Sequence, residues 1–299
     1  MSAEWIAVDW GTTHLRAWIF EGENTPAHSL SSTDGMGSLD HDGFEPALLK
    51  LISPHLGDAP TPVICCGMVG ARQGWIEAPY AKVPGSPPNA RGAARLVAQD
   101  PRLDVRILPG MSQAKPADVM RGEETQIAGY LAAHPNFDGV LCLPGTHSKW
   151  AHISAGEVVS FRTFMTGEMF ALLSKNSVLR HGMAGDGWDD AAFSAAVDDM
   201  ISRPQSLGSD LFSLRAEGLL NGLSSDSARA RLSGLLIGLE LAAARPYWLG
   251  QAVALIGNDT LASRYAAALA GQGVVAQMLD ADAMTLAGLC SAHKTLKEI

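Results

Sequence analysis

Short apolar runs that end at glycine-containing turns alternate along the chain with stretches in which apolar positions follow helical spacing. The short runs predict strands, and the helical spacing predicts helices. Strands are expected at residues 6–8, 15–20, 62–66, 105–108, 140–143, 149–153, 158–164, 252–256 and 274–279. Helices are expected at residues 44–56, 91–99, 123–134, 167–173, 260–270 and 281–295, with three more between residues 189 and 245. This alternation predicts an α/β protein with mixed sheets.

The pattern near the N-terminus returns near the middle of the chain. In both places an apolar run enters a turn that contains Gly and Thr, and a second apolar run follows. When Gly11 is aligned on Gly145 without gaps, Thr12 falls on Thr146. An internal repeat bears on the whole fold, so we expect two similar halves that each begin with a strand, a Gly-Thr turn and a strand.

Composition excludes several classes of protein. Of the 299 residues, 47% are apolar and 18% are charged, which is enough apolar surface for a core and excludes a mainly disordered chain. The formal net charge is −9. A chain of this charge lacks the positive surface potential that attracts nucleic acids or anionic membranes. We therefore expect neither partner. An anionic substrate would need a local positive patch.

Cysteine usage and the N-terminus indicate a cytoplasmic protein. Neither a disulfide framework nor a zinc site is indicated by the spacing of the four cysteines, Cys65, Cys66, Cys142 and Cys290. The acidic Asp9 comes too early for a signal peptide. The longest apolar stretch, residues 232–244, contains Glu240 and is shorter than the ~20 residues that a membrane span needs.

The first candidate site is the turn that follows residues 6–8. Gly11 allows the backbone to approach an anion closely, and turn N–H groups with the hydroxyls of Thr12 and Thr13 can hold phosphate oxygens. Asp9 can hold Mg²⁺ through water, because this ion keeps much of its hydration shell. Arg16 lies just beyond the turn. The alternative interpretation is an ordinary hairpin turn.

The second candidate site is the repeated turn, with Gly145 and Thr146 followed by three further donors, His147, Ser148 and Lys149. The alternative interpretation is a plain hairpin in which His147 is a surface histidine. The pairing of the two turns favours the phosphate interpretation, since two Gly-Thr turns from two similar halves can hold one triphosphate from opposite sides.

Two further segments are candidates. Gly257 and Asn258 stand between a predicted strand and a predicted helix, where a nucleotide can contact the helix N-terminus; the alternative is a plain turn in which Asn258 or Asp259 is the N-cap. Glu123 and Glu124 open another predicted helix. Either one can act as a general base toward a substrate hydroxyl, although acidic residues are also favoured there by the helix dipole alone.

Together these residues resemble a known superfamily. Asp9-Trp-Gly-Thr-Thr13 is similar to the first phosphate motif of the sugar kinase/actin/heat-shock ATPase superfamily, whose members duplicate one domain around an ATP cleft. The resemblance becomes specific to the 2-dehydro-3-deoxygalactonokinase family through four further segments that extend it over essentially the full chain: Cys66-Gly-Met-Val-Gly-Ala-Arg-Gln-Gly-Trp75, Glu77-Ala-Pro-Tyr80, Arg121-Gly-Glu-Glu-Thr-Gln126 and Leu143-Pro-Gly-Thr-His-Ser-Lys-Trp150.

The resemblance implies a fold and an activity. The fold is two ribonuclease H-like, actin-like domains, one over residues 1–118 on the sugar-acid side and one over residues 119–299 on the nucleotide side, with the last helix free to return to the first domain. The activity is ATP-dependent phosphorylation of 2-dehydro-3-deoxy-D-galactonate at its 6-hydroxyl in D-galactonate catabolism, with Mg²⁺. Related carbohydrate kinases have a Gly-Asp-Gln segment where this chain has Gly122-Glu123-Glu124, so either Glu123 or Glu124 is the base.

The resemblance also implies site residues. The first phosphate motif is matched by Asp9, Gly11, Thr12 and Thr13, the second by Gly145, Thr146 and His147, and the adenosine motif by Gly257 and Asn258. The substrate carboxylate needs a cation, and the planar fork of arginine suits it. Arg72 is the first candidate, with Arg121 and Arg162 as alternatives. Gln73 is expected to bind a hydroxyl, and Trp75 either forms an apolar wall or packs in the core.

Other functions remain open from the sequence. One is a kinase for the gluconate epimer, which differs in the configuration of one hydroxyl. Another is an ATPase or polyphosphate-hydrolysing member of the superfamily, which needs the same two turns, and a third is a sugar-acid sensor without catalysis. The apolar positions on the helices between residues 189 and 245 fit packing within the domain or against a second copy, which leaves a homodimer open.

Overall fold

The computed structural model describes residues 2–22 and 25–298. Its contacts divide the chain into two compact units. The first comprises Met1–Phe137, Ser154–Ser160 and Ala281–Ile299, and the second comprises Asp138–Ile153 and Phe161–Asp280. The boundary expected after residue 118 falls inside a strand of the first unit, and the last helix, α9 (Ala281–Lys297), also belongs to that unit.

A six-stranded sheet organises the first unit. Its strands are β1 (Trp5–Trp10), β2 (Leu15–Phe20), β3 (His28–Ser32), β4 (Thr61–Gly67), β6 (Ala94–Leu96) and β7 (Leu103–Ile107). They lie in the order β3-β2-β1-β4-β7-β6. β1 is antiparallel to β2 and parallel to β4. The carboxyl ends of β1 and β4 therefore meet at one edge of the sheet, where the first Gly-Thr turn begins.

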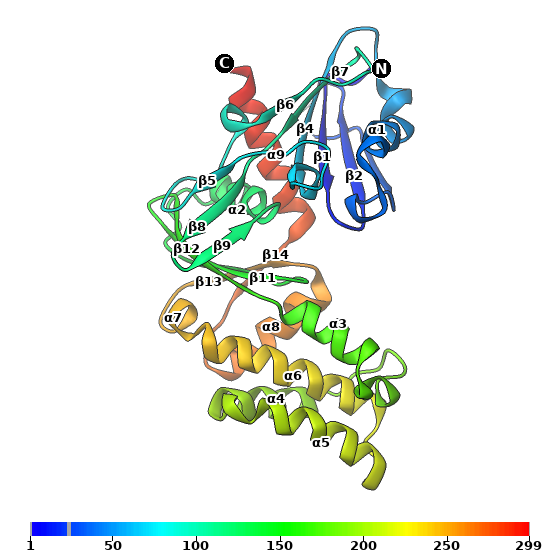
Figure 1. Ribbon diagram of the computed structural model, residues 1–299. Coiled ribbons are helices and arrows are strands. Elements are labelled where there is room, and N and C mark those ends of the chain that lie inside the picture. Colours follow the sequence, from blue (N-terminus) through cyan, green and yellow to red (C-terminus); the bar gives the residue numbers. More distant parts are fainter. Residues whose placement is uncertain (1, 23–24, 299) are drawn as a thin grey trace. The chain divides into compact units, whose positions relative to one another are not determined.

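Both faces of this sheet are covered by helices (Figure 1). Successive residues of a strand point to opposite faces, so Val8 packs with Phe44 of α1 (Phe44–Ile52) on one face. Ala7 packs with Leu289 of α9 on the other face. This two-sided burial explains why the sequence of β1 is an apolar run rather than an alternating one.

A smaller sheet completes the first unit. Its strands β5 (Tyr80–Lys82), β8 (Gly110–Ala114) and β9 (Ala117–Met120) lie in the order β5-β8-β9. The helix α2 (Glu123–Ala133) follows β9 and packs along α9. Short 3₁₀ helices in the first unit span Met36–Ser38, His41–Gly43, Ser53–His55, Met68–Gly70 and Ala90–Gly92.

The sheet of the second unit has the order β12-β11-β10-β13-β14. Its strands are β10 (Gly139–Leu143), β11 (Ser148–Ser154), β12 (Glu157–Phe164), β13 (Val253–Gly257) and β14 (Gln277–Asp280). The hairpin residues 154–160, which include the start of β12, are counted with the first unit. The helices are α3 (Thr166–Asn176), α4 (Asp190–Ser202), α5 (Leu207–Leu220), α6 (Ser225–Ala243), α7 (Arg245–Trp248) and α8 (Asp259–Gly271), with 3₁₀ helices at Val178–Gly182 and Pro204–Ser206. Val140 and Leu255 of the sheet pack with Val197 of α4 and Ile237 of α6.

The two large sheets confirm the predicted repeat. In each, a central strand (β1 or β10) is antiparallel to the next strand of the chain and parallel to a later one (β4 or β13). The order β3-β2-β1-β4-β7 thus corresponds to β12-β11-β10-β13-β14. The α/β class, the mixed sheets and the three helices between residues 189 and 245 (α4, α5 and α6) are also as predicted.

One predicted helix is wrong. Residues 91–99 form the end of a 3₁₀ turn and then β6, which is antiparallel to β7. Arg95 lies on the exposed side of this edge strand and pairs with Asp104 of β7, 3.2 Å away. The helical pattern was misleading because tertiary pairing with β7 decides the conformation of such a short segment. Within residues 2–22 and 25–298, no helix combines the length and the apolar character that a membrane span requires.

Candidate functional site

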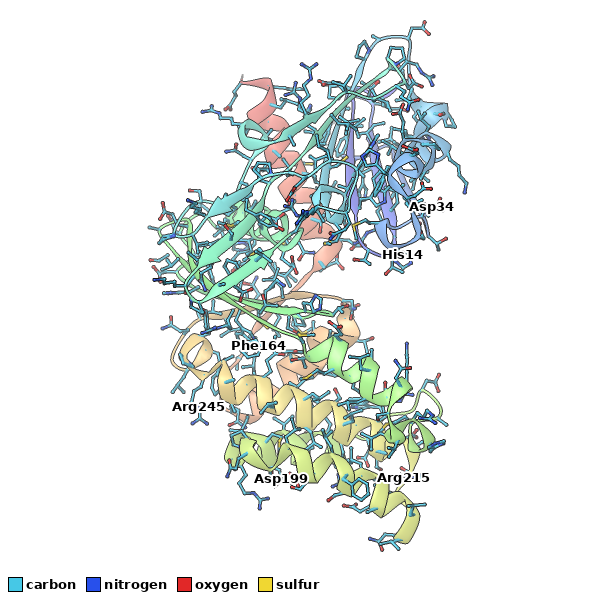
Figure 2. All side chains as sticks on the ribbon, viewed as in Figure 1. His14, Asp34, Phe164, Asp199, Arg215 and Arg245 are labelled. Carbon is cyan, nitrogen blue, oxygen red and sulfur yellow. The ribbon has the colours of Figure 1, made fainter. Side chains whose placement is uncertain are left out.

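The first Gly-Thr turn joins β1 to β2 and is held from outside. Within the turn, the Gly11 N–H donates to the carbonyl of His14 (3.0 Å). From the 3₁₀ helix Met36–Ser38, the Gly37 N–H donates to the carbonyl of Thr12 (2.8 Å). Gly35 touches this turn so closely that a Cβ atom there would lie 2.5 Å from the Thr12 oxygen. Figure 2 shows His14 and Asp34 at this end of the sheet. The side chains of Thr12 and Thr13 are exposed, so they are free to meet a ligand.

Asp9, at the end of β1, belongs to an ionic chain. Its Oδ2 accepts a hydrogen bond from Arg16 Nη2 (2.6 Å), and Arg16 Nη1 donates to Asp282 of α9. Burial raises the pKa of Asp9, and the adjacent Arg16 opposes that rise. Arg16, expected to bind phosphate, is therefore engaged by two carboxylates. Asp282 escaped the sequence analysis because an acidic residue in a first helical turn has an ordinary explanation.

Glu123 and Glu124 occupy different environments at the start of α2. Both carboxylate oxygens of Glu124 accept from the Gly122 N–H at 2.8 Å, and the side chain is only 1% exposed. Burial, followed by repulsion from Glu123, raises the pKa of Glu124 to about 7. Glu123 is half-buried and accepts from the Arg121 N–H (3.1 Å). Glu124 thus caps the helix from inside, and Glu123 is the more accessible acid.

Gly67, the last residue of β4, brings these acids together. A Cβ atom on Gly67 would lie 3.2 Å from Asp9 Oδ1, and its Cα lies 3.5 Å from where a Cβ on Gly122 would stand. Gly67 also has φ +91°, a backbone conformation that glycine adopts without strain. The charges of Asp9 and Glu124 both raise the pKa of the neighbouring Cys66. We call Asp9, Glu123, Glu124 and Asp282 the carboxylate cluster.

The candidate sugar-acid residues differ in exposure. Arg72 and Gln73 are exposed on the turn that follows the 3₁₀ helix Met68–Gly70. Trp75 is 5% exposed, and its ring packs edge-on against Trp10, with 6.0 Å between centroids. This is the core-packing role that the sequence left open for Trp75.

The two alternative arginines also have defined surroundings. Arg121 is buried beside the carboxylate cluster, where its Nη2 donates to the Ala78 carbonyl (2.8 Å) and its guanidinium lies over the Tyr80 ring, 4.3 Å from the centroid. Arg162 is exposed on β12. Of the three candidate arginines, Arg72 and Arg162 are thus open to solvent.

In the second unit, the repeated turn and the adenosine motif meet in one pocket of about 380 Å³. Gly145, Thr146 and Asn258 line it. We call this cavity the glycine-turn pocket, and its size lies in the range typical of small-molecule sites. The other lining residues, which the sequence analysis did not find, are Thr166, Gly167, Phe170, Ser233, Leu236, Ile237, Leu261, Arg264 and Tyr265.

The repeated turn rests on the start of α3. A Cβ atom on Gly167 would lie 2.3 Å from the Gly145 oxygen, so the two backbones touch. The Glu168 N–H donates to the Thr146 carbonyl (2.9 Å), and the Glu168 carboxylate lies 2.6 Å from His147 Nε2. At Gly145 itself, a Cβ atom would have no protein atom within 4 Å. Protein packing therefore does not require glycine at this position, whereas the close approach of a ligand would.

Two residues of this motif do not face a ligand as the sequence suggested. Ser148 is fully buried, and its hydroxyl bonds the Tyr265 hydroxyl at 2.9 Å. Lys149 is 4% exposed, and its Nζ lies 3.5 Å from the His147 carbonyl. The prediction that both serve as additional phosphate donors is not supported, because successive residues of a strand point to opposite faces and both of these side chains are buried.

Gly257 and Asn258, the predicted adenosine motif, join β13 to α8 beside the glycine-turn pocket. Asn258 is the N-cap of α8, accepting from the Leu261 N–H (2.9 Å), as the alternative interpretation predicted, and it also lines the pocket. Gly257 ends β13, where a Cβ would make an ordinary 3.4 Å contact with Ala262. Arg264, one helical turn beyond Leu261, lies over the Trp188 ring, 3.7 Å from its centroid. Burial lowers the pKa of Arg264.

Comparison with known proteins gives a consistent result. The family model described as 2-keto-3-deoxy-galactonokinase matches residues 9–292. A Rhizobium meliloti protein with the 2-dehydro-3-deoxygalactonokinase name is 40% identical, covering 98% of this chain and 97% of its own, and the Escherichia coli protein of that name is 35% identical, covering 98% and 99%. A Sinorhizobium meliloti crystal structure under that name superposes with a TM-score of 0.89 at 38% identity, covering 99% of this chain and 100% of its own.

Proposed function

Because the chain belongs to the 2-keto-3-deoxy-galactonokinase family, we propose that it transfers the γ-phosphoryl group of ATP to the 6-hydroxyl of 2-dehydro-3-deoxy-D-galactonate. The product is the 6-phosphate, the substrate of an aldolase in D-galactonate catabolism. The observation that carries the proposal is the glycine-turn pocket, since Gly145, Thr146 and Asn258, which come from two separate motifs, line one cavity.

ATP binds in this pocket with its adenosine near Asn258 and its phosphates at the Gly145 turn. The exposed Thr146 offers a hydroxyl and a backbone N–H to the phosphate oxygens. The space beside Gly145 lets a phosphate approach the backbone. In the first unit, the exposed Thr12 and Thr13 at Gly11 offer hydroxyls of the same kind.

Glu123 is the general base of this mechanism. It is the more accessible of the two acids at the start of α2, whereas Glu124 is committed to the Gly122 N–H and almost fully buried. Glu123 accepts the proton of the sugar hydroxyl as the oxygen–phosphorus bond forms, and the γ-phosphoryl leaves ADP. Kinases depend mainly on positioning and charge stabilisation, so the base contributes a rate factor of ~10²–10⁴.

The carboxylate cluster fits a hydrated Mg²⁺. Hard oxygen ligands are what this ion prefers, and it is commonly held through one or two carboxylates and water. Asp9 Oδ1 accepts a long hydrogen bond from Cys66 Sγ (3.8 Å), and a carboxylate oxygen can accept more than one bond. Asp282 lies on the other side of Arg16. When bound, Mg²⁺ neutralises charge on the phosphates. Asp9 would hold the ion through water, and Arg16 fixes the Asp9 carboxylate.

The sugar acid is held at the turn that carries Arg72 and Gln73. Arg72 is exposed and has the planar guanidinium that pairs with a carboxylate through two hydrogen bonds. Gln73 beside it offers an amide to a sugar hydroxyl. Arg121 is less suited to this role because it is buried against Ala78 and Tyr80.

The test is ADP release with a panel of 2-keto-3-deoxy sugar acids, including the galactonate and gluconate forms, and with no sugar. We expect the galactonate form to stimulate release most. Faster release with gluconate would identify a kinase for the epimer, sugar-independent release an ATPase, and no release a sensor. The Glu123→Gln variant should keep ATP affinity and lose ~10²–10⁴-fold of turnover, while the exposed Glu157→Gln control stays at wild-type rate. Full turnover in Glu123→Gln would reassign the base.

A further inference from the structure

Glu240 of α6 is a buried acid in the second unit that the proposed mechanism does not use. It is 1% exposed, yet its carboxylate accepts hydrogen bonds from three other elements. Trp150 of β11 donates to Oε1 (2.7 Å), Tyr265 of α8 donates to Oε2 (2.7 Å), and Thr166 of α3 donates to the same Oε2. Burial raises the pKa of Glu240 to about 7, and all three donors oppose the rise.

The network continues from Glu240 to the phosphate turn. The Ser148 hydroxyl lies 2.9 Å from the Tyr265 hydroxyl, and the Gly145 N–H points to Ser148 Oγ at 3.5 Å. Tyr265 donates to Glu240 Oε2, and its oxygen is also within bonding distance of Ser148. Ser148 Oγ can in turn accept from the Gly145 N–H. The bond between Tyr265 and Glu240 thus begins a chain of contacts that reaches the repeated turn.

The same carboxylate holds two walls of the glycine-turn pocket. Thr166 and Tyr265 both line the pocket, and both are bound to Glu240 Oε2. Gly167, next to Thr166, is in backbone contact with Gly145. One buried group therefore fixes α3, α8 and the repeated turn relative to one another. If only packing were needed, an apolar side chain would avoid the cost of burying a charge.

We propose that Glu240 is a positioning residue for ATP, which holds the Gly145 turn and the Thr166–Tyr265 wall in the geometry that binds the phosphates. Glu240 itself touches neither substrate nor the reacting atoms, and its effect passes through Ser148, Thr166 and Tyr265. The inference rests on the proposed ATP site. It predicts a selective effect on ATP, because none of these residues belongs to the carboxylate cluster.

Glu240→Gln and Ser148→Ala test the proposal. Gln keeps the shape but places an NH₂ group against one donor, and Ala breaks the link between Gly145 and Tyr265. We expect the KM for ATP to rise about tenfold in each variant, the effect of losing a hydrogen bond in a charged network, with the KM for the sugar acid within twofold of wild type. Glu217→Gln, which removes a half-exposed carboxylate paired with Arg231 in the same unit, is the control and should change neither KM.

The double variant decides whether the residues act together. Two members of one network are not additive, so Glu240→Gln with Ser148→Ala should raise the KM for ATP little beyond either single variant. An unchanged KM for ATP, an equal rise in the KM values of both substrates, or full additivity would overturn the proposal. If Glu240→Gln does not fold, Ser148→Ala decides alone. A wild-type chain that neither binds ATP nor releases ADP would instead contradict the proposed function, which separates the two failures.

Discussion

Replacement of the buried Glu124 by Gln should change how stability depends on pH. The pKa of this carboxyl is raised from 4.5 to about 7 in the folded chain, mainly by burial. Between these two values the folded chain keeps a proton that the unfolded chain has released. The free energy of unfolding of the wild type therefore falls as pH rises through this window. Gln does not titrate, so the variant lacks this decline.

The magnitude follows from the shift. Each pKa unit corresponds to 1.36 kcal/mol, so a rise from 4.5 to about 7 gives a maximum of about 3 kcal/mol. The free energy of unfolding of Glu124→Gln minus that of the wild type should rise by about this amount between pH 4.5 and pH 8. Losing the bonds to the Gly122 N–H adds an offset, but that offset does not depend on pH.

Urea unfolding at half-unit steps from pH 4.5 to pH 8 measures this difference. Other shifted groups cancel in the comparison. His293, for example, has a pKa lowered to about 4 by burial, which makes stability rise with pH between 4 and 6.5, but it does so in both proteins. Glu157→Gln, at an exposed position, should give a flat difference. If the difference for Glu124→Gln is also flat, Glu124 titrates normally, and its assignment as a buried cap is refuted.

Three further variants test individual assignments. Asp9→Asn should raise the Mg²⁺ concentration for half-maximal ADP release by about 10–100-fold, the usual cost of losing an outer-shell partner; an unchanged magnesium titration would exclude this role. Gly145→Ala should keep the wild-type Tm because the new Cβ meets no protein atom within 4 Å, but should raise the KM for ATP about tenfold by crowding the phosphates. A KM for ATP equal to that of the wild type would show that the phosphates bind elsewhere. Arg72→Ala should raise the KM for the sugar acid about tenfold or more and leave the KM for ATP unchanged. An unchanged KM for the sugar acid would indicate that Arg121 or Arg162 binds the carboxylate instead.

The sequence predicts those parts of the fold that local patterns determine. The apolar runs of β1 and β10 are buried on both sides, so their composition alone marks them as strands, and the turns that end them keep Gly and Thr in both halves. Residues 91–99 show the limit of this reasoning. Their conformation depends on pairing with β7, which lies in a later segment of the chain.

The candidate site divides in the same way. Asp9, Gly145 and Asn258 are recognisable because each stands at or just after the end of an apolar run and has a chemical use for its position. Asp282 and Glu240 are not recognisable in the sequence, since nothing in their local context distinguishes them from ordinary helical acids. Only the folded chain places Asp282 against Arg16 and Glu240 among three donors. Tertiary contact, rather than any motif, gives these two acids their significance.

The choice between Glu123 and Glu124 shows how a distant helix determines a site. Adjacent residues on a helix point about 100° apart, so the rotation of α2 decides which acid is buried. That rotation is set by contact with α9, along which α2 lies (Figure 1). A Cβ atom on Gly129 would lie 2.0 Å from the Met284 oxygen, and one on Gly288 would lie 2.0 Å from the Thr125 oxygen, so either side chain would force the helices apart.

The same contact explains an otherwise unfavourable residue and connects both ends of the chain to the carboxylate cluster. Glycine inside a helix costs about 1 kcal/mol relative to alanine, so Gly129 is a sequence feature that indicates close packing even without a structure. The close approach of α2 and α9 faces Glu124 inward and leaves Glu123 more accessible, and the N-terminal turn of the same α9 carries Asp282 to Arg16. Gly129→Ala should therefore disturb the carboxylate cluster as well as the helix pair, and activity and Tm should fall together. A loss of Tm with full activity would show that the α2–α9 contact does not set the position of the base.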